Sequence, residues 1–255
     1  MHFAACIEWL FADTQETLEG RVAAAKAAGF SAVEIHLWRS KNIPALRAAL
    51  DGSGVRLDSL CVDPRRSLVD PAEHGEFLDA VKDSLEAAKA LDCKALVVAS
   101  GFTREGVTHQ AQHQAIVEVL TRAAALAAEK GLTLLLEPLN TRVEHPGMFL
   151  SSTTEGLDIV QEVNSPHLRL LLDVYHSSVM DEDLAAVLGG RVDLVGHVQF
   201  ADKPGRGEPG SGVIDWTSVM RTLKAVGYDK GIGLEFKPTG PMVEVLPRLH
   251  AALGV

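Results

Sequence analysis

Three carboxylates and one amide stand where four consecutive apolar segments of the sequence end. They are Glu137, Asp173, Gln199 and Glu235. If these ends meet, the carboxylates raise one another's pKa and destabilise the site unless a cation neutralises them. Carboxylate and amide oxygens favour one hard divalent ion, Mg²⁺ or Mn²⁺, over Zn²⁺ or Co²⁺. The competing interpretation is that each acid pairs separately with a lysine or arginine. Four oxygen-bearing side chains at equivalent positions on consecutive strands favour a shared cation instead.

The elements that must position these residues alternate regularly along the chain. Short aliphatic runs predict strands at 3–8, 32–37, 55–62, 94–99, 132–137, 168–173, 194–200 and 231–236. Longer amphipathic stretches predict helices near 14–28, 42–52, 71–91, 109–130, 153–163, 181–189, 215–226 and 240–253. Such alternation gives a parallel sheet with right-handed crossovers. Eight units in 255 residues favour one (β/α)8 TIM barrel domain spanning 1–255, with an open doubly wound sheet as the alternative.

The alternation of side chains along each strand indicates which polar residues share a face. Active sites of such barrels lie at the carboxyl ends of the strands, and alternate residues of a strand share one face. His197 therefore shares a face with Gln199, and we expect it to pack beneath the site. Gly233 shares a face with Glu235 and leaves room beside it.

Two further side chains are expected to contact substrate. His176 follows Asp173 on a predicted short loop, which brings its ring back over the same end of the barrel. The glycine- and proline-rich segment 201–212 presents Arg206, a natural donor to an anion or hydroxyl group. This segment also matches G-x-G-x-x-G, but no helix opens directly after the strand, so a dinucleotide site is rejected.

Charge and cysteine content exclude several classes of function. The chain has 24 basic and 34 acidic side chains and a net charge of −10. That balance argues against nucleic acid or an anionic membrane as partner. The N-terminus lacks a basic segment before an apolar run, and the three cysteines form no C-x-x-C pair, so we expect a cytoplasmic protein. The sequence leaves a homo-oligomer open.

Four segments carry a resemblance to the xylose isomerase-like barrel family of sugar isomerases and epimerases, closest to its hydroxypyruvate isomerase branch. They are LLLEPLNTR (134–142), LLLDVYH (170–176), GHVQFADKPGRGEPGSGVIDW (196–216) and GLEFKP (233–238). The resemblance implies that Glu137, Asp173, Gln199 and Glu235 hold a divalent metal. It also implies that Glu137 and Glu235 are the catalytic acid/base pair and that His176 and Arg206 bind substrate. The chain departs from the branch at 143–145, which lengthens the segment after strand five.

The resemblance thus implies a metal-dependent isomerase that moves a proton through an enediolate of a small hydroxy-carbonyl or sugar substrate. A ketose 3-epimerase or an inosose dehydratase-type lyase on the same site is the nearest alternative. An endonuclease IV-like repair enzyme is more remote, because Gln199 replaces a histidine and the net charge is −10. A non-catalytic sugar-binding barrel is equally remote.

Overall fold

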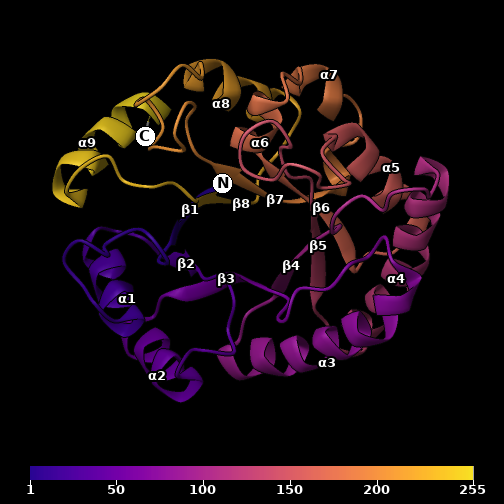
Figure 1. Ribbon diagram of the computed structural model, residues 1–255. Coiled ribbons are helices and arrows are strands. Elements are labelled where there is room, and N and C mark those ends of the chain that lie inside the picture. The colour runs from indigo at the N-terminus through magenta and orange to yellow at the C-terminus, as the bar shows by residue number, and fades with distance from the viewer. Residues whose placement is uncertain (255) are drawn as a thin grey trace.

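Eight parallel strands hydrogen-bond in chain order, and the eighth pairs with the first, which closes a barrel (Figure 1). This computed structural model describes residues 1–254. The strands are β1 His2–Cys6, β2 Ala32–Glu34, β3 Arg56–Cys61, β4 Ala95–Ala99, β5 Thr133–Glu137, β6 Leu168–Asp173, β7 Val195–Phe200 and β8 Gly231–Leu234. The predicted (β/α)8 barrel is confirmed, and the open sheet is excluded because β1 and β8 are hydrogen-bonded partners.

Helices follow the strands and form the outer ring of the barrel (Figure 1). They are α1 Leu18–Ala27, α2 Ile43–Ser53, α3 His74–Leu91, α4 His109–Lys130, α5 Thr153–Val163, α6 Val174–Val179, α7 Leu184–Leu188, α8 Trp216–Ala225 and α9 Met242–Leu253. Two 3₁₀ turns, η1 Pro71–Glu73 and η2 Val192–Leu194, precede α3 and β7. Local sequence sets the boundaries: Thr108 caps the start of α4, and Gly131 ends it in the left-handed conformation.

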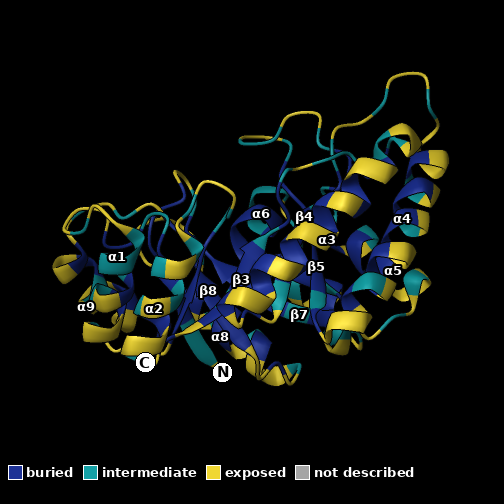
Figure 2. Ribbon diagram, turned by 90° about the horizontal axis from the view of Figure 1, so that it is seen from below, coloured by how far each residue is buried: buried dark blue, intermediate teal, exposed yellow. Residues whose placement is uncertain are grey.

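The strands are mostly buried, and the exposed faces of the helices point outward (Figure 2). Their apolar residues contribute to one large cluster that also takes in the inner faces of the helices. Burial on both sides explains why the strands are almost continuously apolar in sequence. Among residues 1–254, no helix is both long enough and apolar enough to span a membrane.

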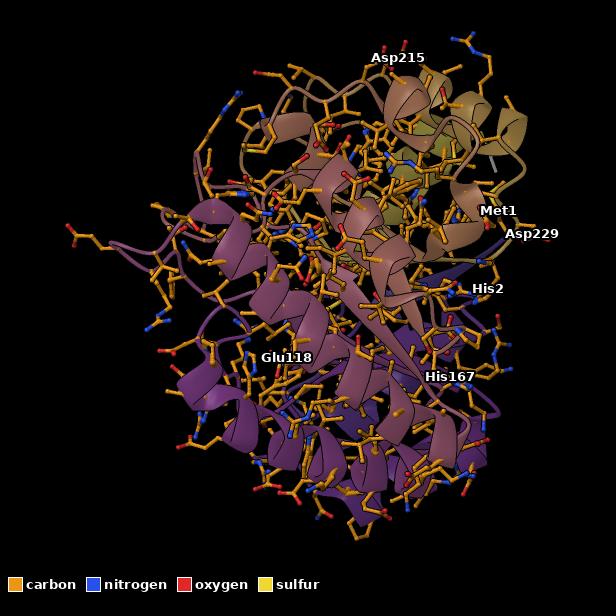
Figure 3. The ribbon with its side chains drawn as sticks, turned by 90° about the vertical axis from the view of Figure 1, so that its right-hand side faces the viewer. Met1, His2, Glu118, His167, Asp215 and Asp229 are labelled. Carbon is orange, nitrogen blue, oxygen red and sulfur yellow. The ribbon has the colours of Figure 1, made fainter. Side chains whose placement is uncertain are left out.

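The two ends of the barrel differ, because the predicted site residues lie at only one of them. His2, His167 and Asp229, each at or just before the start of a strand, lie toward the same end of the molecule (Figure 3). Glu137 and Asp173 are the last residues of β5 and β6, and Glu235 follows β8 directly. The predicted gathering of polar residues therefore falls at the carboxyl ends of the strands.

The expected loop after the sixth strand is wrong, because α6 begins directly after Asp173. The carboxylate of Asp173 accepts a hydrogen bond from the Tyr175 amide at 2.8 Å and caps this helix. Six residues are too few for helical periodicity to be visible in sequence, whereas a capping aspartate stabilises even a short helix. His176 consequently lies on a rigid first turn rather than on a loop.

Candidate active site

A cavity of about 710 Å³ opens at the carboxyl ends of the strands. Among the predicted site residues, Glu137, His176, Arg206 and Glu235 line it. Asp173, Gln199 and His197 are buried, and within residues 1–254 they are not part of its lining. The predicted set is therefore split between the wall of the cavity and the layer of side chains beneath it.

The two predicted catalytic glutamates have opposite electrostatic environments. Burial, together with the negative charges of Glu235 and Asp173, raises the pKa of Glu137 well above its usual value. Burial also opposes ionisation of Glu235, but Arg206 and a 2.7 Å contact with Nε2 of His36 outweigh it and lower the pKa of Glu235 to about 2. Glu137 thus retains a proton more readily, and Glu235 is held ionised.

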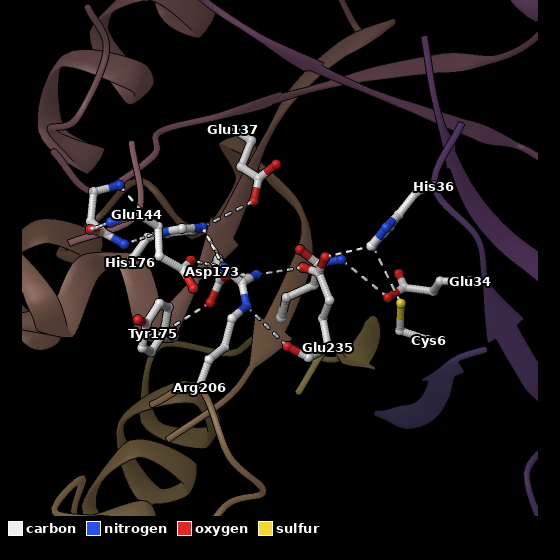
Figure 4. A network of polar contacts seen from close by, with 12 residues as sticks. Cys6, Glu34, His36, Glu137, Glu144, Asp173, Tyr175, His176, Arg206 and Glu235 are labelled. Carbon is white, nitrogen blue, oxygen red and sulfur yellow. Dashed lines mark hydrogen bonds and ion pairs between the residues drawn. The ribbon is translucent and has the colours of Figure 1, made fainter. Parts of the chain in front are cut away.

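Arg206 lies at the centre of the acidic residues (Figure 4). Its Nη2 donates to Oδ2 of Asp173 and to Oε2 of Glu235, both at 2.9 Å, and its Nη1 donates to Oε2 of Glu144 at 2.6 Å. These carboxylates outweigh the cost of burial and raise the pKa of the arginine, which stays charged. In this structure the guanidinium of Arg206 supplies positive charge between the strand-end carboxylates of Asp173 and Glu235.

The histidine on α6, His176, turns its Nε2 toward Arg206 and the acidic residues. Its Nδ1 accepts from the backbone N–H of Asn140 at 3.2 Å. Burial, followed by the charge of Arg206, lowers the pKa of His176 to about 2, so the ring is neutral. Both ring nitrogens face donors, because Nη1 of Arg206, which can only donate, lies 3.0 Å from Nε2. That nitrogen lies 3.5 Å from Oδ2 of Asp173 and 3.9 Å from Oε1 of Glu137.

Gln199 is buried, and only one end of its amide has a partner. Its Nε2 donates to Oε2 of Glu34 at 3.1 Å. Within residues 1–254 its Oε1 accepts no hydrogen bond. His197, two residues earlier on β7, places Nε2 2.5 Å from Oε1 of Glu34, whose charge raises the pKa of His197 in spite of burial. The structure thus brings His197 into the layer beneath the cavity through Glu34.

Sequence reasoning missed Glu34, His36 and Glu144. Glu34 and His36 alternate within the predicted strand 32–37 and so share a face, which was the signal that could have revealed them. The side chain of Glu34 occupies the space beside Gly233. A Cβ built on that glycine would lie 2.1 Å from Oε2 of Glu34. Glu144 lies in the lengthened segment 143–145 and reaches Arg206 from there.

The residues present fit a hard divalent ion. Ligating atoms of Glu137, Asp173 and His176 lie within 4.8 Å of one another. The unpartnered Oε1 of Gln199 is a buried acceptor of the kind that a cation satisfies. A ligating atom of Glu235 groups instead with those of Cys6 and His36 within the same distance.

Removing the charge of Asp173 is expected to flatten the pH dependence of stability. Burial raises the pKa of Asp173 to about 7, whereas an unfolded aspartate has a pKa of about 3.9. The folded protein binds the extra proton between these values, so this stabilisation is present below about pH 4 and is lost as pH rises to about 7. In chelator, Asp173→Asn should remove a decline of a few kcal/mol in the free energy of unfolding.

Denaturant titrations at a series of pH values would measure this effect. Asp158→Asn, which removes an exposed partner of Arg191 outside the cavity, is the matched control and should keep the wild-type slope. Equal pH slopes for wild type and Asp173→Asn would contradict the expected role of this carboxyl.

Known proteins resemble this chain over nearly its whole length. A family model described as Xylose isomerase-like TIM barrel matches residues 22–251. A mouse protein with a provisional hydroxypyruvate isomerase name is 33% identical, covering 98% of this chain and 95% of the relative. The 2-oxo-tetronate isomerase of Cupriavidus necator is 30% identical, covering 99% and 98%.

A solved structure is similar to the same extent. The crystal structure described as AP endonuclease, family 2, from Brucella melitensis is 31% identical, has a TM-score of 0.89 and covers 96% of both chains. The curated relatives confirm the expectation of an isomerase enzyme. With its closed barrel, its strand-end acids and these matches, the chain belongs to the xylose isomerase-like TIM barrel family.

Proposed function

We propose that this enzyme is a divalent-metal-dependent, hydroxypyruvate isomerase-like isomerase of a small hydroxy-carbonyl or sugar substrate. The observation that carries the proposal is the pair of glutamates with opposed pKa shifts, Glu137 and Glu235, facing one cavity. Two titratable groups whose environments separate their pKa values are typical of acid/base pairs. The isomerase names of the relatives support the same class of reaction.

Glu137, Asp173, Gln199 and Glu235 would hold one metal ion, with Mg²⁺ or Mn²⁺ favoured by the all-oxygen donor set. Such an ion supplies positive charge at the carbonyl and hydroxyl oxygens of a substrate and so acidifies the neighbouring C–H bond. Binding it requires the guanidinium of Arg206 to leave its place between Asp173 and Glu235.

The protein's own groups then divide the proton transfer. Ionised Glu235 takes the proton from the substrate carbon, which leaves an enediolate, and protonated Glu137 delivers a proton to the neighbouring carbon. The hydroxyl proton passes to the former carbonyl oxygen, so that the carbonyl and the hydroxyl group exchange places. Once Arg206 has moved, Nε2 of His176 is free to form a hydrogen bond with a substrate oxygen. The freed guanidinium of Arg206 donates to an anionic or hydroxyl group of the substrate. In the reverse direction the two glutamates exchange roles.

Solvent isotope incorporation tests the proposal directly. The Mn²⁺-loaded enzyme would be incubated in D₂O with hydroxypyruvate, a 2-oxo-tetronate and C4–C6 ketoses, and products followed by NMR. We expect deuterium at the carbon that gains the proton. Absence of deuterium from every compound would overturn the proton-transfer proposal.

The same experiment separates the alternatives. A ketose 3-epimerase returns an epimer with deuterium at the inverted carbon, and a dehydratase-type lyase returns a product that has lost water. Cleavage of a duplex with an abasic site would instead favour the activity for which the Brucella structure is named. Calorimetric sugar binding without turnover would favour a binding protein.

A further inference from the structure

A small polar cluster lies buried beside the cavity, with side chains contributed by β2, β3 and β7. Its members are Glu34, Ser59, His197 and Gln199, and all four are buried. Glu34 is only 1% exposed and contacts the other three. A carboxylate this deep is costly unless its partners are well placed, so its contacts are informative.

The two oxygens of Glu34 have separate partners. Oε1 accepts from the hydroxyl of Ser59 at 2.9 Å and lies 2.5 Å from Nε2 of His197. Oε2 accepts from Nε2 of Gln199 at 3.1 Å. Oε2 therefore has the Gln199 amide as its hydrogen-bond donor, while Ser59 and His197 contact Oε1.

The contact with Glu34 fixes which end of the Gln199 amide points away from it. Turning the amide round would place its oxygen against a carboxylate oxygen, which is repulsive because both atoms are acceptors only. The carbonyl Oε1 is therefore held away from Glu34, buried and without a partner in residues 1–254. Leaving a buried acceptor unsatisfied destabilises the folded protein, and a bound ligand would remove that cost.

The backbone of β8 makes room for this arrangement. A Cβ at Gly233 would lie 2.1 Å from Oε2 of Glu34 and 2.9 Å from Cγ of Gln199. Both distances are too short for any residue other than glycine unless the two side chains move. The absence of a side chain at Gly233 thus allows Glu34 and Gln199 to keep their observed positions.

We propose that Glu34 is a positioning residue of the metal site, which holds the Gln199 amide with its carbonyl oxygen toward the divalent ion. This inference rests on the proposed function, because it assumes that Gln199 is a metal ligand. Hydrogen-bond partners of metal ligands contribute about 10–100-fold to metal affinity in proteins. Glu34 itself contacts neither substrate nor metal in this assignment.

The test measures Mn²⁺ affinity from the electron paramagnetic resonance signal of free Mn²⁺, without an activity assay. Glu34→Gln replaces two acceptor oxygens with one and introduces an NH₂ that donates to Gln199 and turns its amide round. We expect the Kd for Mn²⁺ to rise about 10–100-fold. Ser59→Ala removes a contact to the other oxygen of Glu34 and is the matched control, with an expected change below about threefold.

A donor–acceptor swap separates positioning from a purely structural role. In the double variant Glu34→Gln/Gln199→Glu, the amide NH₂ donates to one oxygen of the new carboxylate, and the other oxygen stays free to bind metal. We expect the swap to recover Mn²⁺ affinity at least to the wild-type value. The single variant Gln199→Glu places two carboxylates face to face and should not. If Glu34→Gln does not fold, Glu34→Asp keeps the carboxylate but shortens the side chain that reaches Gln199, and it should weaken Mn²⁺ binding similarly.

The outcomes separate this inference from the function on which it rests. Wild-type protein that binds no Mn²⁺ overturns both the metal-dependent function and the role of Glu34. Wild-type protein that binds Mn²⁺, with equal affinity in the folded Glu34 variants, overturns the role of Glu34 and leaves the proposed function standing. Failure of the swap to recover affinity while Glu34→Gln loses it assigns Glu34 a structural role only and overturns the inference.

Discussion

Glu235→Gln and Glu137→Gln are each expected to lower kcat about 10²–10⁴-fold, because each removes one proton-transfer group. The two losses should differ in kind. The contact of Glu235 with His36 does not depend on Arg206, so Glu235 is the expected base in one direction, and Glu137, whose pKa is raised by burial, is the expected acid. Glu137→Gln should therefore still exchange the abstracted proton with D₂O, whereas Glu235→Gln should not.

The kcat and exchange measurements must be made at the same metal content in every variant, since these glutamates are also proposed ligands. They are therefore made at saturating Mn²⁺, and the bound metal is measured in parallel. Glu144→Gln is the matched control, because Glu144 lines the same cavity and contacts Arg206 but has no assigned proton transfer. We expect its kcat to change less than about tenfold. A wild-type kcat in either principal variant would refute the acid/base assignment.

Removal of divalent metal is expected to lower turnover at least about a thousandfold. A bound ion contributes several kcal/mol to stabilising negative charge on a reacting substrate, and about 1.4 kcal/mol corresponds to a factor of ten. The loss should be reversible, with Mg²⁺ or Mn²⁺ restoring the rate, because the barrel core does not depend on these residues. The measurement is the initial rate after exhaustive chelation and after each ion is added back.

Circular dichroism before and after chelation is the control for folding. Full turnover at a metal content far below one ion per chain would contradict metal dependence. If activity is lost in chelator and Zn²⁺ or Co²⁺ restores it better than Mg²⁺ or Mn²⁺, the preference expected from an all-oxygen donor set is wrong.

Much of the fold was predictable because its signals are local. The predicted strand 168–173 and the predicted helices 109–130 and 153–163 match β6, α4 and α5 residue for residue. Hydrophobic period, a threonine or serine cap at the start and a left-handed residue at the end act within a few residues, so the sequence displays them directly. The same reading missed α6, which is too short to show a period.

The candidate site was predictable only in outline. Closure of the barrel gives the ends of all strands a common mouth, so acids in phase on β5, β6 and β8 had to approach one another. The sequence does not say which neighbour each acid meets. Arg206 was expected to contact substrate over the mouth, yet in the structure its guanidinium lies between Asp173 and Glu235.

What the sequence alone determined is the alternation of strands and helices and the phase of the polar residues at the strand ends. Only the tertiary structure decided that Glu34 fills the space left by Gly233 and that Glu137 and Glu235 acquire opposed pKa shifts. Glu34 and Gly233 are far apart in the chain and meet only because β8 closes the barrel beside β1. Burial and charge at each carboxylate depend on such distant neighbours, whereas strand and helix periods depend on near ones.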